Sequence, residues 1–509
     1  MSTLPPRTPG SSPSDYSRLL AEAAERAPEH MAVLAEDAQY TYQELQAAVE
    51  QAAAGLSALG VRPRDRVGLC LGNEPAWIVA FFALARLRAA AVLLSTAWRE
   101  HEMAHALALT GPVAVIADAA SAAVVDAVGR PGLAVVVGPE PREGWTPFGA
   151  LRGDAGTLPE TGDPAELELA LPFSSGTTGL PKAVRHTHRS LCAATTQWRE
   201  SLGVTATDRL QGITPLSHIL GIVNVGATFE GTATIRLFRR FDTASMVESF
   251  AADRITIGLT VAPIAAALAA MPDLERFDLR SLRYLNWSAT PVNAEIARRV
   301  TERTGVGWRP AYGTTEVPIL AMNPAEGARL DSVGLAPRGV QLEAIDPGTL
   351  EFLPRGRTGE LVARSTAAML GYLPEDAPDP FLDGGWYRTG DLGHVEPEGW
   401  IVVSGRLKEL IKVSGYQVSP VEIENLLATS PLVADCAVFG APDDRRGEAP
   451  CAAVVPAAGW TPDAQELLDW LSPRLAPYKR LRDVFFVEAI PRTPSGKIQR
   501  RHLTPLTGA

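Results

Sequence analysis

Short apolar runs alternate with helix-patterned segments from Asp15 to about residue 140, and this alternation constrains the fold more than any other feature. The segment YQELQAAVEQAAAGLSAL (42–59) carries apolar residues three and four positions apart, which predicts a helix. RVGLCL (66–71) is an apolar run bounded by charges, and Asn73-Glu74-Pro75 predicts the start of the next helix. PVAVIAD and LAVVVG repeat the strand pattern. Strands separated by helices predict an α/β fold with a largely parallel, helix-covered sheet.

The pattern of predicted secondary structure changes twice after that region. Its 509 residues exceed what one hydrophobic core supports, so more than one domain is expected. Short β-like runs between many Gly and Pro residues predict a β subdomain over 331–400. After Gly405, helix and strand patterns mix in a compact α+β unit. We therefore expect a disordered tail (1–14), a large N-terminal domain (15–405) and a small C-terminal domain (406–509), with the boundary at Arg406-Leu407-Lys408.

Composition excludes several classes of function. The net charge is −11 and no basic cluster is present, which argues against nucleic acid as a partner. The apolar stretch that begins at Ala76 is interrupted by Arg86 and Arg88, a pattern typical of a buried helix that leads into a strand rather than of a membrane span. The four cysteines are scattered and the N-terminus has no apolar signal core, so we expect buried thiols and a cytoplasmic protein.

A loop rich in small residues stands out in PFSSGTTGLPKAVRHTHRSL (172–191). It follows a strand-like run and precedes a segment that is expected to be helical from about His188, an arrangement in which free backbone N–H groups meet an anion. It is not a Walker A loop, because only two residues separate Gly176 from Gly179 and a proline precedes Lys182. Taken alone, the loop is also compatible with an ordinary surface loop.

Four further motifs follow the loop along the chain: AYGTTE (311–316), WYRTGDLG (386–393), GRLKELIKVSGYQVSPVEIE (405–424) and PRTPSGKIQR (491–500). With these five motifs in this order, the chain resembles the adenylate-forming enzymes, which include acyl-CoA synthetases, peptide-synthetase adenylation domains and firefly luciferases. The resemblance extends from about residue 15 to the C-terminus. It implies that a carboxylic acid attacks the α-phosphorus of ATP, giving an acyl adenylate and pyrophosphate.

The chemistry of that reaction indicates which residues it needs. A carboxylic acid has a pKa of about 4 to 5, so at neutral pH it is already ionised and needs no general base. The difficulty is electrostatic, because two unit charges 4 Å apart repel by roughly 4 kcal/mol at an effective dielectric of 20. Fixed cations and amide dipoles are therefore the expected catalysts.

The resemblance assigns roles to particular residues. It implies that the loop from Ser174 to Lys182 holds the β- and γ-phosphates of ATP. Tyr312 would stack on adenine, and Asp391 would accept hydrogen bonds from the ribose. The implied catalytic residues are Lys497, which would bridge the attacking carboxylate and the α-phosphate, His218, Thr315 at the α-phosphate, and Glu316, which would bind Mg²⁺. The implied ATP-binding set is Ser174, Ser175, Gly176, Thr177, Thr178, Gly179, Lys182, Ser288, Ala289, Thr290, Ala311, Tyr312, Gly313, Thr314, Thr315, Asp391 and Arg406.

Two reactions in one pocket imply two domain arrangements, because Lys497 must leave before a thiol can enter. Lys408 matches the pivot at which the small domain of the family turns, which makes the C-terminal domain mobile. Ser414, Gly415 and Tyr416 match the stretch that lines the thiol's tunnel, where glycine permits close passage of a pantetheine arm.

The segment TPLSHILGIVNVG (214–226) matches the acid pocket of the family, with His218 at the position of a gate. On its own, a histidine among apolar residues is more typical of a protein core. The segment contains no aspartate that would pair with the ammonium of an amino acid, so a hydrophobic carboxylic acid is expected. Fatty, aryl and bulky polycyclic acids all remain open. The expected pocket residues are His218, Ile222, Val223, Asn224, Trp287, Val317 and Pro318.

Three functions compete. The first is an AMP-forming acid:CoA ligase, with ATP, Mg²⁺ and coenzyme A as cofactors, and it is favoured because we expect no fused carrier-protein domain. The second is a stand-alone adenylating enzyme that loads a separate carrier protein. The third, a binding protein without turnover, is disfavoured because Glu316, Asp391, Arg406 and Lys497 are all present. The run SATP (288–291) lacks the glycine pair that is usual in the family. A homodimer is compatible with the sequence.

Overall fold

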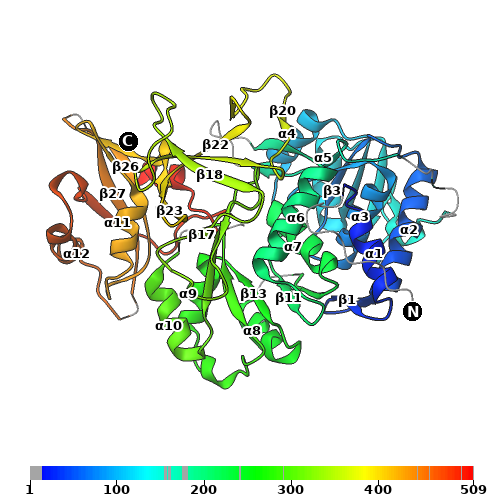
Figure 1. Ribbon diagram of the computed structural model, residues 1–509, viewed down its shortest axis with the longest axis horizontal. Coiled ribbons are helices and arrows are strands. Elements are labelled where there is room, and N and C mark those ends of the chain that lie inside the picture. The colour runs from blue at the N-terminus through cyan, green and yellow to red at the C-terminus, as the bar shows by residue number, and fades with distance from the viewer. Residues whose placement is uncertain are drawn as a thin grey trace.

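The computed structural model describes residues 14–153, 158, 162–174, 181–239, 242–290, 292–443, 445–457, 459–493 and 496–507. The tail expected at the N-terminus therefore lies, apart from Ser14, outside the described residues. The described elements form three sheets with helices packed on them, which confirms the predicted α/β fold. In Figure 1 the blue N-terminal helices lie at one end of the molecule and the orange and red C-terminal elements at the other.

The first sheet contains the parallel strands that the sequence predicted. Helix α2 covers Tyr42–Leu59, as expected, because a capping box of Thr41 and Glu44 starts it and Gly60 ends it in the left-handed conformation. Helix α3 (Pro75–Leu87) begins at its proline. Helices α4 (Glu100–Thr110) and α5 (Ala119–Val128) follow. In spatial order the strands are β20 (Gly371–Leu373), β10 (Lys182–Thr187), β8 (Glu168–Leu171), β4 (Ala90–Leu93), β3 (Arg66–Cys70), β5 (Ala114–Asp118), β6 (Leu133–Val137) and β7 (Thr146–Pro147), with β9 (Phe173–Ser174) on β10.

The second sheet is parallel in one half and antiparallel in the other. Its parallel half is β2 (Gln39–Thr41, itself antiparallel to β1), β1 (Met31–Leu34), β12 (Thr234–Leu237), β11 (Arg209–Gly212), β13 (Ile257–Thr260), β14 (Tyr284–Trp287) and β15 (Trp308–Tyr312). Its antiparallel half is β16 (Ala321–Met322), β17 (Gly334–Leu335), β23 (Trp400–Arg406), β22 (Trp386–Val395), β19 (Gly359–Ser365) and β18 (Val340–Ile345), with β21 (Phe381–Leu382) on β22. The Gly- and Pro-rich region thus forms β structure that continues the parallel sheet through the pairing of β15 with β16.

Helices α6 to α10 belong to the same large part of the molecule. They are α6 (His188–Leu202), α7 (Ile219–Glu230), α8 (Thr243–Ala252), α9 (Ala262–Ala270) and α10 (Ala294–Thr304). Helices α6 and α7 pack against each other along their length, and Figure 1 shows them side by side near the middle of the molecule.

The third sheet forms the C-terminal unit. Its order is β25 (Tyr416–Val418), β24 (Ile411–Val413), β27 (Gly447–Pro456) and β26 (Val433–Asp443), with β28 (Asp483–Phe486) parallel to β27. Helices α11 (Pro420–Leu427) and α12 (Ala464–Leu471) cover it. A single 3₁₀ turn, Leu407–Glu409, separates β23 from this unit, and Lys408 lies in its middle.

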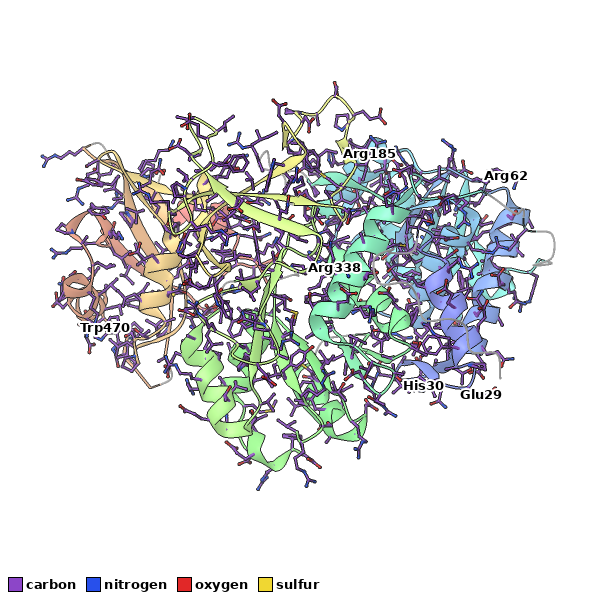
Figure 2. The ribbon with its side chains drawn as sticks, viewed as in Figure 1. Glu29, His30, Arg62, Arg185, Arg338 and Trp470 are labelled. Atoms are coloured by element: carbon purple, nitrogen blue, oxygen red, sulfur yellow. The ribbon has the colours of Figure 1, made fainter. Side chains whose placement is uncertain are left out.

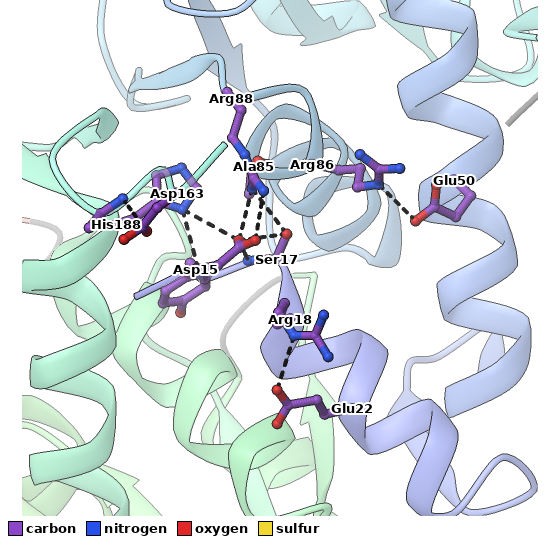
Figure 3. Close-up of polar contacts among 12 residues, drawn as sticks. Asp15, Ser17, Arg18, Glu22, Glu50, Ala85, Arg86, Arg88, Asp163 and His188 are labelled. Atoms are coloured by element: carbon purple, nitrogen blue, oxygen red, sulfur yellow. Dashed lines mark hydrogen bonds and ion pairs between the residues drawn. The ribbon is translucent and has the colours of Figure 1, made fainter. Parts of the chain in front are cut away.

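The N-terminal segment is held between the two large sheets by a buried ion pair. Both carboxylate oxygens of Asp15 accept hydrogen bonds from Arg88, at 2.9 and 2.7 Å, and the ring of His188 lies 3.7 Å from the same carboxylate (Figure 3). The hydroxyl of Tyr16 donates to the Ile222 carbonyl at 2.9 Å. These contacts attach helix α1 (Arg18–Arg26) to α3, α6 and α7, the helices that position part of the site.

Polar side chains project over the outer surface, with Arg62 labelled near one end of the molecule and Trp470 of α12 near the other (Figure 2). Among the described residues, no helix combines the length and the apolarity that a crossing of the bilayer requires.

Candidate active site

A cavity opens where the parallel strands β14 and β15 end, which is the edge at which α/β sheets bind their ligands. Water-sized spheres can reach about 40 Å³ of it, so the cavity is narrow in this arrangement of the chain. Lys497 reaches it from the C-terminal unit, whereas every other lining residue comes from the large part. The lining residues are Trp198, His218, Ile219, Leu220, Ser288, Ala289, Ala311, Tyr312, Gly313, Thr314, Thr315, Pro318, Ile319 and Lys497.

The backbone at the strand ends is shaped by two unusual residues. A Cβ on Gly313 would lie 1.9 Å from the Pro318 carbonyl oxygen, so only glycine allows the chain after β15 to fold back this tightly. Ala289 has a φ of 62°, a left-handed conformation that costs a residue with a Cβ about 1 kcal/mol. Ala289 belongs to the run SATP (288–291), where the family usually has glycines. Its backbone conformation is therefore one that glycine would adopt more easily.

Lys497 is presented on a tight turn. The Thr493 amide donates to the Lys497 carbonyl at 2.8 Å, and the Lys497 amide donates to the Thr493 hydroxyl at 3.1 Å. Arg492 donates to the Gly496 carbonyl at 3.0 Å while it also pairs with Asp435. A Cβ on Gly496 would lie 3.3 Å from Pro263 of α9, so this turn packs closely against the large part of the molecule.

Burial and nearby charges shift the pKa of Lys497. Burial lowers the pKa of its ammonium below that of an ordinary lysine, and the positive charge of Arg406 lowers it further. Asp391 and Glu316 act in the opposite direction. One nearby cation and several nearby carboxylates thus act on the pKa of Lys497 in opposite directions.

His218 is neutral at physiological pH. Burial, and secondarily the charge of Lys497, lowers its pKa to about 4. Its Nδ1 accepts a hydrogen bond from the Leu220 amide at 3.2 Å, as the N-cap of α7. The proton of the neutral ring is therefore on Nε2. His218 thus offers the cavity a hydrogen-bond donor without a charge.

Tyr312, Asp391 and Arg406 form a connected group beside the cavity. The Tyr312 hydroxyl donates to one oxygen of Asp391 at 2.6 Å, and Nε of Arg406 donates to the other at 2.8 Å. Asp391 is buried, and each of its oxygens keeps a second lone pair for a ligand hydroxyl. The pairing of β22 with β23 places Asp391 opposite Arg406.

Glu316 directly follows the two threonines of the AYGTTE motif in the chain. Its carboxylate accepts a hydrogen bond from the Tyr372 hydroxyl at 3.0 Å. Lys182 lies over the Tyr372 ring, with Nζ 5.2 Å from the ring centre. Among the described residues, no group of three or more His, Cys, Asp or Glu side chains is arranged to hold a metal ion. A single carboxylate still suits Mg²⁺ that is bound mainly by nucleotide phosphates, so Glu316 fits that ion.

The other expected residues lie in several places. Thr290 uses its hydroxyl to accept from the Ala262 amide and from Trp287 Nε1, both at 3.0 Å. Ser174 ends β9 beside Lys182, whereas Ser175, Gly176, Thr177, Thr178 and Gly179 lie outside the described residues. The expected pocket residues that are buried in the protein without lining the cavity are Ile222, Val223, Asn224, Trp287 and Val317. Of the expected pocket set, His218 and Pro318 line it.

The three residues that were expected to line the thiol tunnel do not line the cavity in this structure. Ser414 and Gly415, with φ values of 49° and 84°, form the exposed turn between β24 and β25. Tyr416 is 56% exposed and stacks on Tyr478 with ring centres 4.4 Å apart. None of the three lines the cavity that contains Lys497.

Several residues that line the cavity or contact its lining were not predicted from the sequence. Trp198, Ile219, Leu220 and Ile319 line the cavity. Ile219 and Leu220 directly follow His218, so their position in the motif could have revealed them. Trp198 lies in α6 and reaches the cavity only because α6 packs on α7. His186 is buried, and its Nε2 lies 2.8 Å from the Thr315 carbonyl oxygen, a contact across 129 positions that no motif indicates.

The fold, the five motifs and the lysine carried by the small unit define an adenylate-forming enzyme. The chain belongs to the family of AMP-binding enzymes, whose model matches residues 20–373, and the model of the C-terminal domain of these enzymes matches residues 422–497. This confirms the resemblance and the class of enzyme, an AMP-forming ligase of the acyl-CoA synthetase type.

Known proteins resemble the chain over almost its whole length. 4-Coumarate–CoA ligase 1 of Solanum tuberosum is 33% identical over 489 residues, which are 92% of this chain and 89% of the relative. 4-Coumarate–CoA ligase 2 of Oryza sativa subsp. japonica is 36% identical over 494 residues, 91% of this chain and 87% of the relative. The structure of the anthranilate CoA ligase AuaEII in complex with anthranoyl-AMP is 26% identical and covers 97% of this chain and 98% of its own, with a TM-score of 0.88.

The lowered pKa of Lys497 predicts how the reaction depends on pH. If the ammonium is the active form, adenylation falls as pH rises through a pKa below that of an ordinary lysine. Replacing Arg406 with methionine removes the nearby positive charge, so the pH at which the rate falls should move upward. Pyrophosphate release measured from pH 7 to 11 checks this. A rate that stays constant up to the pKa of a free lysine would contradict the assignment.

Proposed function

We propose that this protein activates a hydrophobic carboxylic acid with ATP and transfers the acyl group to coenzyme A. One observation carries the proposal: Lys497 of the C-terminal unit shares a cavity with His218, Tyr312 and Thr315 of the large part. A cation between an acid site and a nucleotide site is what the approach of two anions requires.

Each group then has a task in adenylation. The ionised acid lies with its carboxylate between Lys497 and the Nε2 proton of neutral His218. Thr315, held through its carbonyl by His186, contacts the α-phosphate. Asp391 and Arg406 hold the ribose, and Tyr312 lies against adenine. Glu316 would hold Mg²⁺, which would supply positive charge beside the phosphates. The carboxylate oxygen forms a bond to the α-phosphorus, and pyrophosphate leaves with the electron pair.

The second half-reaction requires a different arrangement. The acyl adenylate loses AMP when a thiolate attacks its carbonyl carbon. The turn Ser414–Gly415 lies outside the cavity while Lys497 lies inside. Rotation about Lys408 would exchange the two, and this supports a hinge at 406–408 between domains 15–405 and 406–509. The names of the two plant relatives, both CoA ligases, support coenzyme A as the thiol.

The lining of the cavity supports a hydrophobic acid. Among its described lining residues, none is an aspartate or a glutamate, so an α-ammonium group would be buried without a partner. Trp198, Leu220 and Ile319 line the cavity and belong to one hydrophobic cluster. An aryl acid fits this lining, and the 4-coumarate and anthranilate ligases among the similar proteins support that class.

A two-stage assay tests the proposal. Purified protein with ATP and Mg²⁺ is offered benzoic, cinnamic, fatty and amino acids, and pyrophosphate release is measured; aryl acids should be the best substrates and amino acids poor ones. Coenzyme A or a pantetheinylated carrier protein is then added, and the thioester is detected by mass spectrometry. Acyl adenylate that accumulates despite coenzyme A, or is consumed by the carrier protein alone, would contradict the choice of thiol.

A further inference from the structure

A second cavity lies at the opposite edge of the sheet that carries the candidate active site. The strands β11, β13, β14 and β15 run parallel, and the active-site cavity lies where β14 and β15 end. The second cavity lies where β11, β12 and β13 begin, because Arg209, Thr234 and Thr256 line it. Water can reach about 400 Å³ of it, which is enough for a small molecule. Apart from Ala206, every residue that lines it is polar or charged.

The one carboxylate of this lining is already fully hydrogen-bonded. Asp208 is buried, and one of its oxygens accepts from the Thr256 hydroxyl and from Arg283, both at 2.7 Å. The other oxygen accepts from the amide and the hydroxyl of Thr205, at 2.8 and 2.9 Å. Because a carboxylate oxygen has two lone pairs, neither oxygen has one left for a metal ion. The ion pair with Arg283 also balances the charge of Asp208, so a cationic ligand is not expected here.

Two arginines of the lining have no carboxylate partner. Nη1 of Arg209 donates to the backbone carbonyl of Asp253 at 2.8 Å, and this is a neutral acceptor. Arg254 is exposed, and its side chain forms no hydrogen bond or ion pair with another described residue. Both guanidinium groups therefore keep a positive charge that an anion can balance.

The acidic side chains near these arginines are paired with other arginines. The carboxylate of Asp253 pairs with Arg236 at 2.8 Å. Asp278 accepts two hydrogen bonds from Arg280, both at 2.8 Å. These bonds are the main reason that the pKa of Asp278 is lowered, and the charge of Arg254 contributes least. Neither carboxylate thus replaces an anion at the two lining arginines.

A buried imidazole nitrogen adds a third group without a partner. His30 lines the cavity, and its Nε2 is buried with no hydrogen-bond partner among the described residues. The ring is stacked on Tyr42, with ring centres 6.2 Å apart. Figure 2 labels His30 at the lower edge of the molecule, where Figure 1 labels β1 and β11. Buried polar atoms rarely stay unpaired in native proteins, and a bound anion would accept a hydrogen bond from this nitrogen.

We propose that this cavity binds a phosphate group, either free or as part of a small molecule. Arg209 and Arg254 contact the phosphate oxygens, and Nε2 of His30 donates to one of them. Two guanidinium groups match the two charges of a phosphate dianion better than the single charge of a carboxylate. A four-residue strand spans about 13 Å between the two edges of the sheet, so this site is distinct from the one proposed for ATP. The inference is therefore independent of the proposed function.

Hydrogen exchange measured by mass spectrometry localises the binding. The full-length protein without nucleotide is given inorganic phosphate or ribose 5-phosphate at constant ionic strength, each up to about 20 mM, since two charged contacts suggest a Kd of about 1 mM or below. Peptides that span 203–209 and 250–256 should exchange more slowly, with saturation. Peptides that span 311–320 report separately on the active-site cavity.

The two probes distinguish the two sources of phosphate. Protection by ribose 5-phosphate at a lower concentration than inorganic phosphate would assign the site to a phosphorylated small molecule, whereas protection by inorganic phosphate at an equal or lower concentration would assign it to the free ion. Acetate is the control anion and should give no protection. Absence of protection with both phosphates, or equal protection by acetate, would overturn the inference.

Substitutions test the assigned contacts. Arg254→Gln should weaken phosphate binding about tenfold, the effect of losing one charge-assisted hydrogen bond, and no hydrogen bond within the described structure is lost with it. His30→Phe keeps a ring that can stack on Tyr42, removes Nε2, and should weaken binding by a smaller factor. Arg276→Gln is the control, because Arg276 is exposed, pairs with Asp273 and does not line the cavity. Wild-type affinity in Arg254→Gln, or an equal loss in Arg276→Gln, would overturn the inference.

Discussion

Replacing Lys497 with alanine is expected to slow adenylate formation about a thousandfold, the order of magnitude lost when a fixed cation or donor is removed from a charged transition state. The reason is that Lys497 is the cation that the C-terminal unit brings into the cavity beside His218 and Thr315. Transfer from supplied acyl adenylate to coenzyme A should keep most of its rate, since the proposed second arrangement would move Lys497 away.

Two measurements check this prediction. Pyrophosphate release reports the first half-reaction, and thioester formation from synthetic acyl adenylate reports the second. Arg474→Ala serves as the control, because it removes a positive charge from the same unit outside the cavity. An equal loss in both half-reactions would contradict the role given to Lys497.

Replacing Lys408 with proline is expected to leave adenylation near its normal rate and to reduce thioester formation by at least a hundredfold, so that overall turnover nearly stops. Lys408 lies in the 3₁₀ turn Leu407–Glu409. Proline holds φ near about −65°, a value within the 3₁₀ range, so it suits the arrangement in which Lys497 lies in the cavity. The rotation that brings Ser414 and Gly415 to the cavity would then be blocked.

Lys408→Ala is the matched control, because it removes the charge and leaves the backbone free to rotate. Both half-reactions should survive in that variant. The two rates are measured separately, as for Lys497. Unchanged overall turnover in the proline variant would contradict a hinge at this position.

Local patterns in the sequence were sufficient to predict helices of the N-terminal region. The helix 42–59 has its own capping box and its own terminal glycine, so its bounds are decided by neighbouring residues. The same holds for α3, which starts at its proline. The motifs located Tyr312, Thr315, Asp391 and Lys497 because each lies in a short segment with a characteristic order of residues.

Only tertiary packing determined which distant side chains contact the residues of those motifs. Trp198 enters the cavity wall from α6 and orients Asn224 on α7, 26 positions away. His186 and Tyr372 meet Thr315 and Glu316 from strands of the other sheet, β10 and β20. These contacts depend on how sheets and helices pack, which apolar burial drives without regard to sequence distance. The sequence by itself thus determined the class of chemistry and the residues that are proposed to bind ATP, whereas the part of the cavity wall that Trp198 supplies arises only from the packing of α6 on α7.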